Sequence, residues 1–189
     1  MNQSSIYKLH QKYAPNEKVL EIGWTHSLIV RDISLQITKK LEKSYGFAID
    51  KNLIEIGALV HDIGYYQYVK NKKNYVEHGE NGYKILIKEE FLKKIARFAL
   101  THVGVGYKKN IPISLEEEIV CYADNFHSKG HPRFNVFEES TEEMIKIDPD
   151  FGVILKRFKD KFGIPDVSKL EEKYRKWHEE INEWVESVK

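Results

Sequence analysis

A histidine and an aspartate stand side by side at the end of an apolar run, as His61 and Asp62. Burying either side chain is unfavourable unless its charge is paired or its hydrogen bonds are satisfied. The apolar residues before the pair have the spacing of a buried helix face, so we predict a helix from about Asp50 to Ile63, with Gly64 as its stop. A metal ion held jointly with other elements is the partner that this pair needs.

Two further histidines lie on predicted helix faces that are otherwise apolar. His26 precedes Val30 by four residues on the apolar stripe of a long helix, predicted from residue 23 or 24 to 45. His102 completes the series i, i+3, i+4, i+7 that starts at Ile95, in a helix predicted from residue 90 to 102. Both imidazoles are therefore expected to face the core.

His78 and Asp124 complete the group of inward-facing polar residues. His78 opens a predicted helix, and glycines one and four residues after it leave one side of that helix bare, so that something can approach the imidazole closely. Asp124 falls inside the apolar arc of a helix that begins at Ser114, where Glu117 completes a capping-box pattern. One helical domain seldom buries so many polar side chains without a shared partner.

These residues predict a divalent metal site. Imidazole nitrogen and carboxylate oxygen suit Fe, Mn, Co, Ni or Zn, with Mg also admitted, and the single Cys121 argues against a structural zinc site. Six candidates exceed one tetrahedral shell, so a two-metal centre is an option, with Asp62 as the bridge between the ions. One ion would be bound by His26, His61 and Asp124, and the other ion would be bound by His78 and His102.

The elements that must position these ligands are helices. Strict alternation and hairpin dipeptides do not recur, so we predict an all-α protein with one domain over residues 1–189, a core of about 23–128 and a C-terminal helical extension of about 134–189. The net charge of +1 gives no sign of a nucleic-acid binder. No signal peptide or membrane span is recognised, and one cysteine fits a reducing compartment, so a cytoplasmic location is expected.

Outside the proposed site, a first helix is predicted from Ser4 to Tyr13, with His10 as a surface histidine. The region from residue 134 onward should form two helices separated near Gly163. The last helix carries an aromatic stripe that is either core or the seam of a homodimer, and His178 at its edge is expected to be structural.

The ordered motifs resemble the HD-domain metal-dependent phosphohydrolases. His26, then His-Asp-Ile-Gly at His61, then Tyr-Ala-Asp-Asn at Asp124 match the four metal positions of that family. His78 in Glu-His-Gly and His102 in Thr-His-Val-Gly look like the two extra histidines of its binuclear branch. The resemblance implies an HD-domain helical bundle, similar to small stand-alone members. The same motifs are also similar to those of the branch that cleaves dinucleoside polyphosphates. That branch tends to carry a lysine soon after the His-Asp pair, whereas Gly64 and two tyrosines follow the pair here.

The resemblance implies hydrolysis of a phosphate ester or anhydride of a small, nucleotide-like molecule by metal-activated water. Asp62 would orient that water, and the segment after Asp124 offers cations for the phosphate. Arg133 would grip phosphate oxygens, with Lys129 as a second cation, while His127 or His131 would protonate the leaving group. Tyr65, Tyr66 and Tyr68 are either stacking groups for a base or a solvated loop.

Two other functions fit the same residues. The ligand order also resembles the di-iron oxygenase branch of this fold, in which iron activates dioxygen. The site would alternatively serve as a non-catalytic nucleotide or metal sensor. Phosphate release with Mn, Co or Ni favours hydrolysis, oxygen uptake by an iron-containing protein favours the oxygenase, and tight nucleotide binding without turnover favours the sensor.

Overall fold

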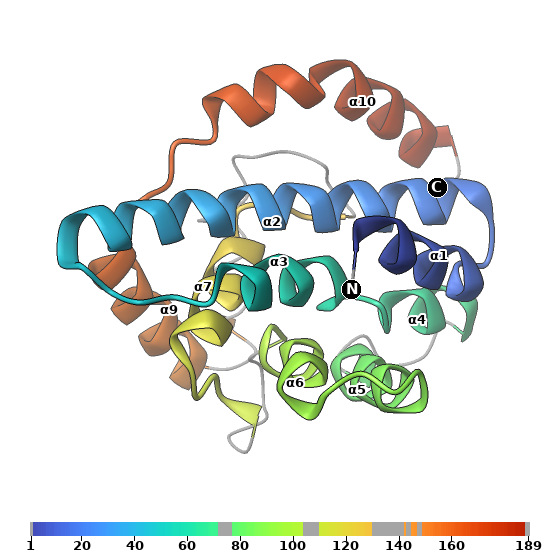
Figure 1. Ribbon diagram of the computed structural model, residues 1–189. Helices are drawn as coiled ribbons and strands as arrows, with labels where there is room; N and C mark the ends of the chain where they lie inside the picture. The colour runs from blue at the N-terminus through green and yellow to red at the C-terminus, as the bar shows by residue number, and fades with distance from the viewer. Residues whose placement is uncertain are drawn as a thin grey trace.

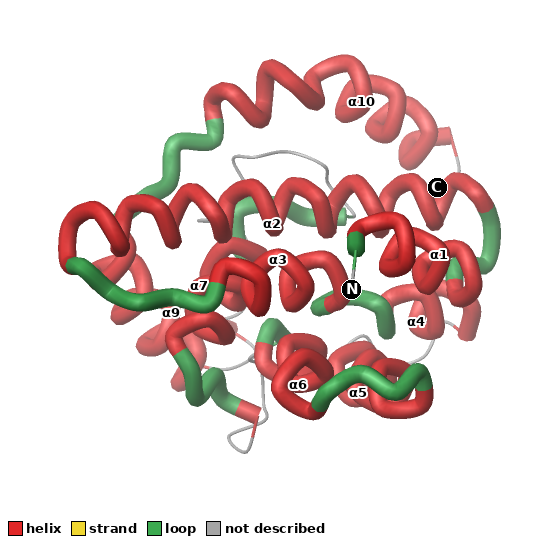
Figure 2. Tube along the Cα trace, in the orientation of Figure 1, coloured by secondary structure: helices red, strands yellow, loops and turns green. Residues whose placement is uncertain are grey.

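The structure is a computed structural model that describes residues 2–71, 77–103, 110–129, 142, 145–146 and 149–187. Within these ranges the regular elements are helices and no strand occurs, which confirms the predicted all-α fold (Figure 2). In chain order the helices are α1 (Gln3–Tyr13), α2 (Glu17–Tyr45), α3 (Lys51–Val60), α4 (Tyr65–Asn71), α5 (His78–Lys88), α6 (Lys93–Thr101), α7 (Leu115–Asp124), α9 (Pro149–Phe162) and α10 (Ser168–Ser187).

Helix α2 crosses the middle of the molecule, with α10 along one side and α3 along the other (Figure 1). It begins at Glu17, six residues before the earliest predicted start, because the side chain of Asn16 accepts a hydrogen bond of 2.9 Å from the Val19 amide and caps it. It ends as predicted at Gly46, whose φ of 65° lies in the left-handed region that favours glycine.

The His-Asp pair lies on a turn rather than on a helix. Asp50 caps α3 as predicted, with its side chain accepting from the Leu53 amide at 3.0 Å, but α3 ends at Val60 and residues 61–64 form a turn. The expectation that the helix continues to Ile63 is therefore wrong. The turn lets two adjacent side chains face one centre, which neighbouring helix positions, about 100° apart, do poorly.

Gly64 is needed because the turn packs directly on the backbone of α5. A Cβ on this residue would overlap the carbonyl oxygen of His78 and would lie 2.5 Å from the amide nitrogen of Gly82. Gly79 in turn lies close to α6, since a Cβ there would be 2.8 Å from the carbonyl oxygen of Ala99. The groups that approach the bare side of α5 are thus this turn and α6, and this contact fixes where His78 stands.

The C-terminal helices pack on the rest of the chain. Helix α9 contributes Phe151, Leu155, Phe158 and Phe162 to the buried core around α2, α3 and α7. Helix α10 lies along α2, where the indole nitrogen of Trp177 donates to Glu21 at 2.8 Å, so its aromatic stripe contacts the same chain. Its start at Ser168 and the break at Gly163 match the prediction of two helices. The limits of the domain and of its extension stay a prediction.

His10 is buried, which contradicts the expected surface histidine. Only 1% of it is exposed, and its ring nitrogens contact the hydroxyl of Tyr66 at 2.7 Å and the carbonyl oxygen of Leu59 at 2.8 Å. Helix α1 packs on α2 and α3, so the partners of His10 come from elements that are distant in the sequence. Burial lowers its pKa to about 4.

Candidate metal centre

Six side chains predicted as metal ligands converge where five segments of the chain meet. His26 comes from the middle of α2, and the others stand at helix ends or on the turn after α3. All are buried except Asp124, whose side chain is 18% exposed. The six are His26, His61, Asp62, His78, His102 and Asp124.

One half of the centre is formed by α2, the turn and α7. His26 Nε2 lies 2.9 Å from Asp124 Oδ1 and 3.3 Å from His61 Nε2. His61 Nε2 is itself 3.3 Å from the same Asp124 oxygen. Two imidazole nitrogens and one carboxylate oxygen therefore face one point.

The other half is formed by α5 and α6. His78 Nε2 lies 2.9 Å from His102 Nε2, and these nitrogens are 3.4 and 3.6 Å from Asp62 Oδ1. Asp62 Oδ2 faces the first half, 3.7 Å from His26 Nε2. Asp62 thus stands between the halves with one oxygen toward each, which is the arrangement that a bridging carboxylate needs.

Backbone carbonyls orient two of the imidazoles. His61 Nδ1 lies 2.7 Å from the carbonyl oxygen of Ala58, and His102 Nδ1 lies 3.3 Å from that of Phe98. A carbonyl only accepts, so each Nδ1 carries the proton and each Nε2 presents its lone pair to the centre. Metal-binding histidines are commonly held in this way by an acceptor on the outer nitrogen.

The electrostatics keep both carboxylates ionised. Burial alone would raise the pKa of Asp62, but the Lys129 ammonium and the facing imidazoles outweigh it and hold this pKa well below its ordinary value. The pKa of Asp124 is likewise held low, against burial, by His61 and His26. Burial and then the Lys129 charge lower the pKa of His26 to about 4. Burial would also lower the pKa of His61, but Asp124 raises it overall.

This donor set fits a divalent metal ion. Both oxygens of Asp62 are buried, and neither accepts a hydrogen bond of ordinary geometry from the described residues. Two Nε2 atoms 2.9 Å apart, as in His78 and His102, need a proton or a cation between them. Among the described residues, three groups bring their ligand atoms within 4.8 Å of one another. These groups are His26–His61–Asp62, His61–His102–Asp124 and Asp62–His78–His102.

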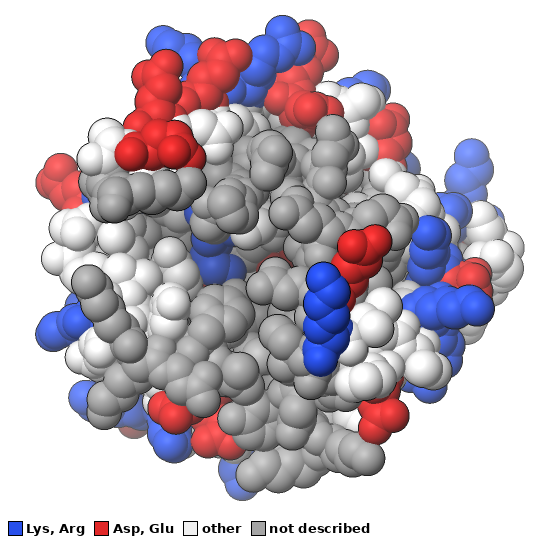
Figure 3. Space-filling view, turned by 180° about the vertical axis from the view of Figure 1, so that it is seen from behind, with Lys and Arg blue, Asp and Glu red and all other residues white. Residues whose placement is uncertain are grey.

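Lys129 lies inside this centre. It is 7% exposed, its ammonium forms an ion pair with Asp62 Oδ2, and its Nζ is 3.4 Å from His26 Nε2. The ammonium also stands over the ring of Tyr65, 5.2 Å from its centroid. Seen from behind, basic atoms and a small area of acidic atoms lie at the bottom of a hollow (Figure 3). The predicted phosphate contact is therefore close to the ligands.

His127 stands behind His26. Its Nδ1 lies 2.8 Å from His26 Nδ1 and its Nε2 lies 3.3 Å from Nε2 of His178 on α10. It therefore contacts the outer nitrogen of a predicted ligand. The predicted leaving-group acid should instead face the carboxylates. His178 has no signal in the sequence as a neighbour of the site. His131 and Arg133 lie outside the described residues.

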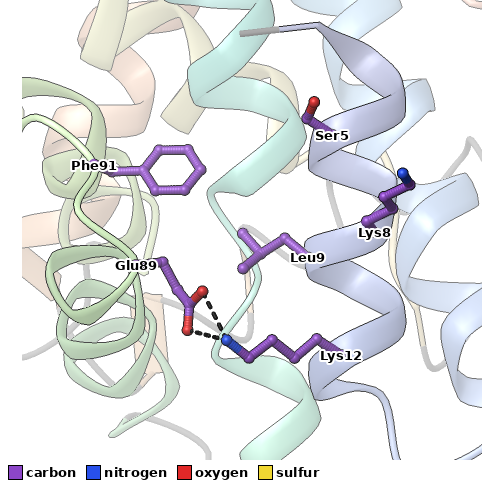
Figure 4. A pocket seen from close by; sticks show the side chains of 6 residues that line it. All are labelled: Ser5, Lys8, Leu9, Lys12, Glu89 and Phe91. Carbon is purple, nitrogen blue, oxygen red and sulfur yellow. Dashed lines mark hydrogen bonds and ion pairs between the residues drawn. The ribbon is translucent and has the colours of Figure 1, made fainter.

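Two other features do not belong to the centre. Cys121 is buried and its thiol contacts the carbonyl oxygen of His102 at 3.7 Å, while burial raises the pKa of the thiol. A pocket between α1 and the α5–α6 connection is lined by none of the six predicted ligands. An ion pair of 2.7 Å between Lys12 and Glu89 joins its two sides (Figure 4).

Among the described residues, no helix combines the length and apolar character needed to cross a membrane.

Three curated relatives share part of this sequence. An uncharacterized protein of Methanocaldococcus jannaschii is 33% identical over 122 residues, which cover 58% of this chain and 66% of that protein. A tRNA (cytidine(56)-2′-O)-methyltransferase of Picrophilus torridus is 25% identical, covering 90% of this chain and 48% of the enzyme. A dihydroneopterin 2′,3′-cyclic phosphate phosphodiesterase of M. jannaschii is 29% identical, covering 55% and 45%. The chain thus spans between about half and two thirds of the length of these relatives.

The fold is that of a solved HD domain. The crystal structure of the HD domain of the phosphodiesterase PgpH from L. monocytogenes matches 92% of this chain and 100% of that domain, with a TM-score of 0.57 and 17% sequence identity. This likeness shows the shared fold. The family model of the HD domain matches residues 23–129, which is more than half of the chain and contains all six predicted ligands. The resemblance inferred from the motifs is confirmed, and the chain belongs to the HD-domain family.

Proposed function

We propose that this protein is a metal-dependent phosphohydrolase that cleaves an ester or anhydride bond of a small phosphorylated metabolite. The observation that carries the proposal is Asp62, whose two oxygens face two separate histidine groups in a buried centre. Divalent ions held there would supply a bound water of lowered pKa and positive charge for the phosphoryl oxygen. His26, His61 and Asp124 would hold one ion, and His78 and His102 the other.

The chain itself supplies orientation and charge. In the proposed reaction Asp62 orients the attacking water through an oxygen that accepts its hydrogen bond. Lys129 neutralises phosphate charge, since its ammonium lies beside Asp62 and His26. We propose Arg133 as a further phosphate contact and His131 as the leaving-group acid, as predicted from the sequence. His127 is assigned no proton transfer to substrate because both of its ring nitrogens contact imidazoles.

The proposed substrate is a phosphorylated, nucleotide-like compound, including a cyclic phosphodiester. The name of the dihydroneopterin cyclic phosphate phosphodiesterase among the relatives supports this class, because it combines a heterocycle with a small cyclic phosphate. Tyr65 beside Lys129 supports it as well, since an aromatic ring next to an ammonium suits a base joined to a phosphate. A cytoplasmic location is part of the proposal.

The test is a screen for hydrolysis with defined metals. The protein is purified anaerobically, its metal content is measured, and it is then loaded with Mn²⁺, Co²⁺ or Ni²⁺. Product release is followed for bis(p-nitrophenyl) phosphate, nucleoside 2′,3′-cyclic phosphates and common nucleotides. We expect activity that His61→Ala abolishes and His10→Gln retains, because His10 is an equally buried histidine outside the ligand set.

The proposal fails if metal-loaded protein leaves every one of these compounds intact. Consumption of oxygen by the iron-loaded protein, without phosphate release, would instead assign the oxygenase chemistry of the same fold. Tight nucleotide binding with neither reaction would assign a sensor.

A further inference from the structure

A row of three buried histidines leads from the metal centre to the last helix. His26 Nδ1 lies 2.8 Å from His127 Nδ1, and His127 Nε2 lies 3.3 Å from His178 Nε2. The rings are close as well, with centroids 5.1 and 5.5 Å apart. The exposed fractions are 0% for His26, 3% for His127 and 8% for His178.

We propose that His178 is a positioning residue of the metal centre, which acts through His127 to hold His26 with its Nε2 toward the metal. Helix α10 is then a structural part of the centre rather than a cover on α2. This inference rests on the proposed function only in taking His26 as a metal ligand.

The need for a second histidine follows from the chemistry of the acceptor. His61 and His102 donate to backbone carbonyls, which accept and never donate, so their tautomers are fixed by one contact each. When Nε2 of His26 faces a metal, its Nδ1 carries the proton and donates to His127 Nδ1. His127 Nδ1 accepts only if the proton of His127 is on its other nitrogen, Nε2, and the nitrogen beside it that can accept this proton is His178 Nε2. His178 therefore stabilises the tautomer of His127 that the metal-binding orientation of His26 requires.

Helix α10 is well placed for this role. Trp177, next to His178, donates to Glu21 on α2 at 2.8 Å, and Ile181 one turn later is completely buried. The Trp177–Glu21 contact holds α10, and with it His178, against the helix that carries His26. Figure 1 shows α10 running along α2. The segment 168–187 lies outside residues 23–129, which match the HD-domain model, so the positioning histidine comes from beyond the matched segment.

The experiment measures binding of Co²⁺ to the full-length protein in the absence of substrate. The affinity and the visible absorption of the bound ion both respond to a change in the ligand His26. His178→Leu removes the acceptor at similar volume, whereas His178→Gln returns an acceptor near the position of Nε2. Ile181→Ala is the matched control, because it removes buried packing from the same helix without removing an imidazole.

We expect His178→Leu to weaken Co²⁺ binding about 10-fold, the lower end of the effect of losing an outer-shell partner, and to alter the absorption spectrum. His178→Gln should restore most of the affinity, and Ile181→Ala should lower the melting temperature while leaving affinity and spectrum unchanged. The inference is overturned if His178→Leu binds Co²⁺ like the native chain. It is also overturned if His178→Leu and Ile181→Ala both lose affinity in proportion to their loss of stability. Native protein that binds no Co²⁺ would overturn it together with the proposed function, whereas an active enzyme with unaffected His178 variants would overturn this inference alone.

Discussion

Replacing Gly64 by alanine should separate the turn of the His-Asp pair from helix α5. The new Cβ would overlap the carbonyl oxygen of His78 and would lie 2.5 Å from the nitrogen of Gly82, whereas real Cβ contacts stay above 3.0 Å. Both neighbours are backbone atoms, so relief requires the two segments to move apart by roughly 1 Å, which in a close-packed interior costs about 1–3 kcal/mol.

The same displacement should weaken metal binding. His78 moves with α5, and its Nε2 lies 3.4 Å from Asp62 Oδ1. Metal–ligand distances vary by only about 0.2 Å, so a shift of this size leaves His78 unable to share an ion with Asp62. We therefore expect a lower metal-to-protein ratio together with the loss of stability.

Gly46→Ala is the matched control. Gly46 has a φ of 65° and no atom within 4 Å of a Cβ, so alanine there carries only backbone strain of about 1 kcal/mol and lies far from the ligands in the sequence. Urea unfolding in EDTA gives the free energies of both variants, and elemental analysis after loading with Mn²⁺ gives their metal content. Equal metal content in the two variants would refute the reasoning that this glycine sets the position of His78.

Three further predictions concern the buried polar residues. The Asp62→Asn variant should bind no metal. In urea unfolding with EDTA present, its free energy of unfolding should be about 3 kcal/mol lower than that of the native protein, because the buried Lys129 loses its carboxylate partner. The double variant Asp62→Asn/Lys129→Met should recover most of that loss. His78→Ala should reduce the metal-to-protein ratio from two to one, as measured by elemental analysis, and an unchanged ratio would favour a mononuclear centre. The pKa of His10 is lowered to about 4, so between pH 6.5 and 4 the unfolded chain binds a proton that the folded chain does not, and stability falls as the pH falls. From pH 7 to pH 5, the free energy of unfolding of the native protein should fall by about 2 kcal/mol more than that of His10→Gln. Equal decreases of the two proteins in urea unfolding would contradict the lowered pKa of His10.

Much of the architecture could be read from local signals. Asp50 and Ser114 cap the helices that they were predicted to begin, and Gly46 ends α2 in the left-handed conformation. These features depend on a few neighbouring residues, whose side chains satisfy or replace the backbone groups left open at helix ends. The start of α2 was not predicted, because its cap, Asn16, lies only three residues after the end of the first helix at Tyr13.

The composition of the centre also followed from the sequence alone. An imidazole or a carboxylate on an apolar helix face must turn inward with the rest of that face, so periodicity identified His26, His102 and Asp124 without any contact being known. The convergence of His26 and His102 on Asp62, and of Asp124 on His26, is what the structure adds.

Only the tertiary structure decided the surroundings of that centre. His10 and Tyr66, His127 and His178, and Lys129 and Asp62 are each paired across at least 51 residues of sequence. Such pairs leave no periodic trace, because each partner satisfies the other only after separate helices have packed. The sequence therefore determined which metal ligands had to face the core and what chemistry they could do, while the packing of separate helices decided which groups lie beside them.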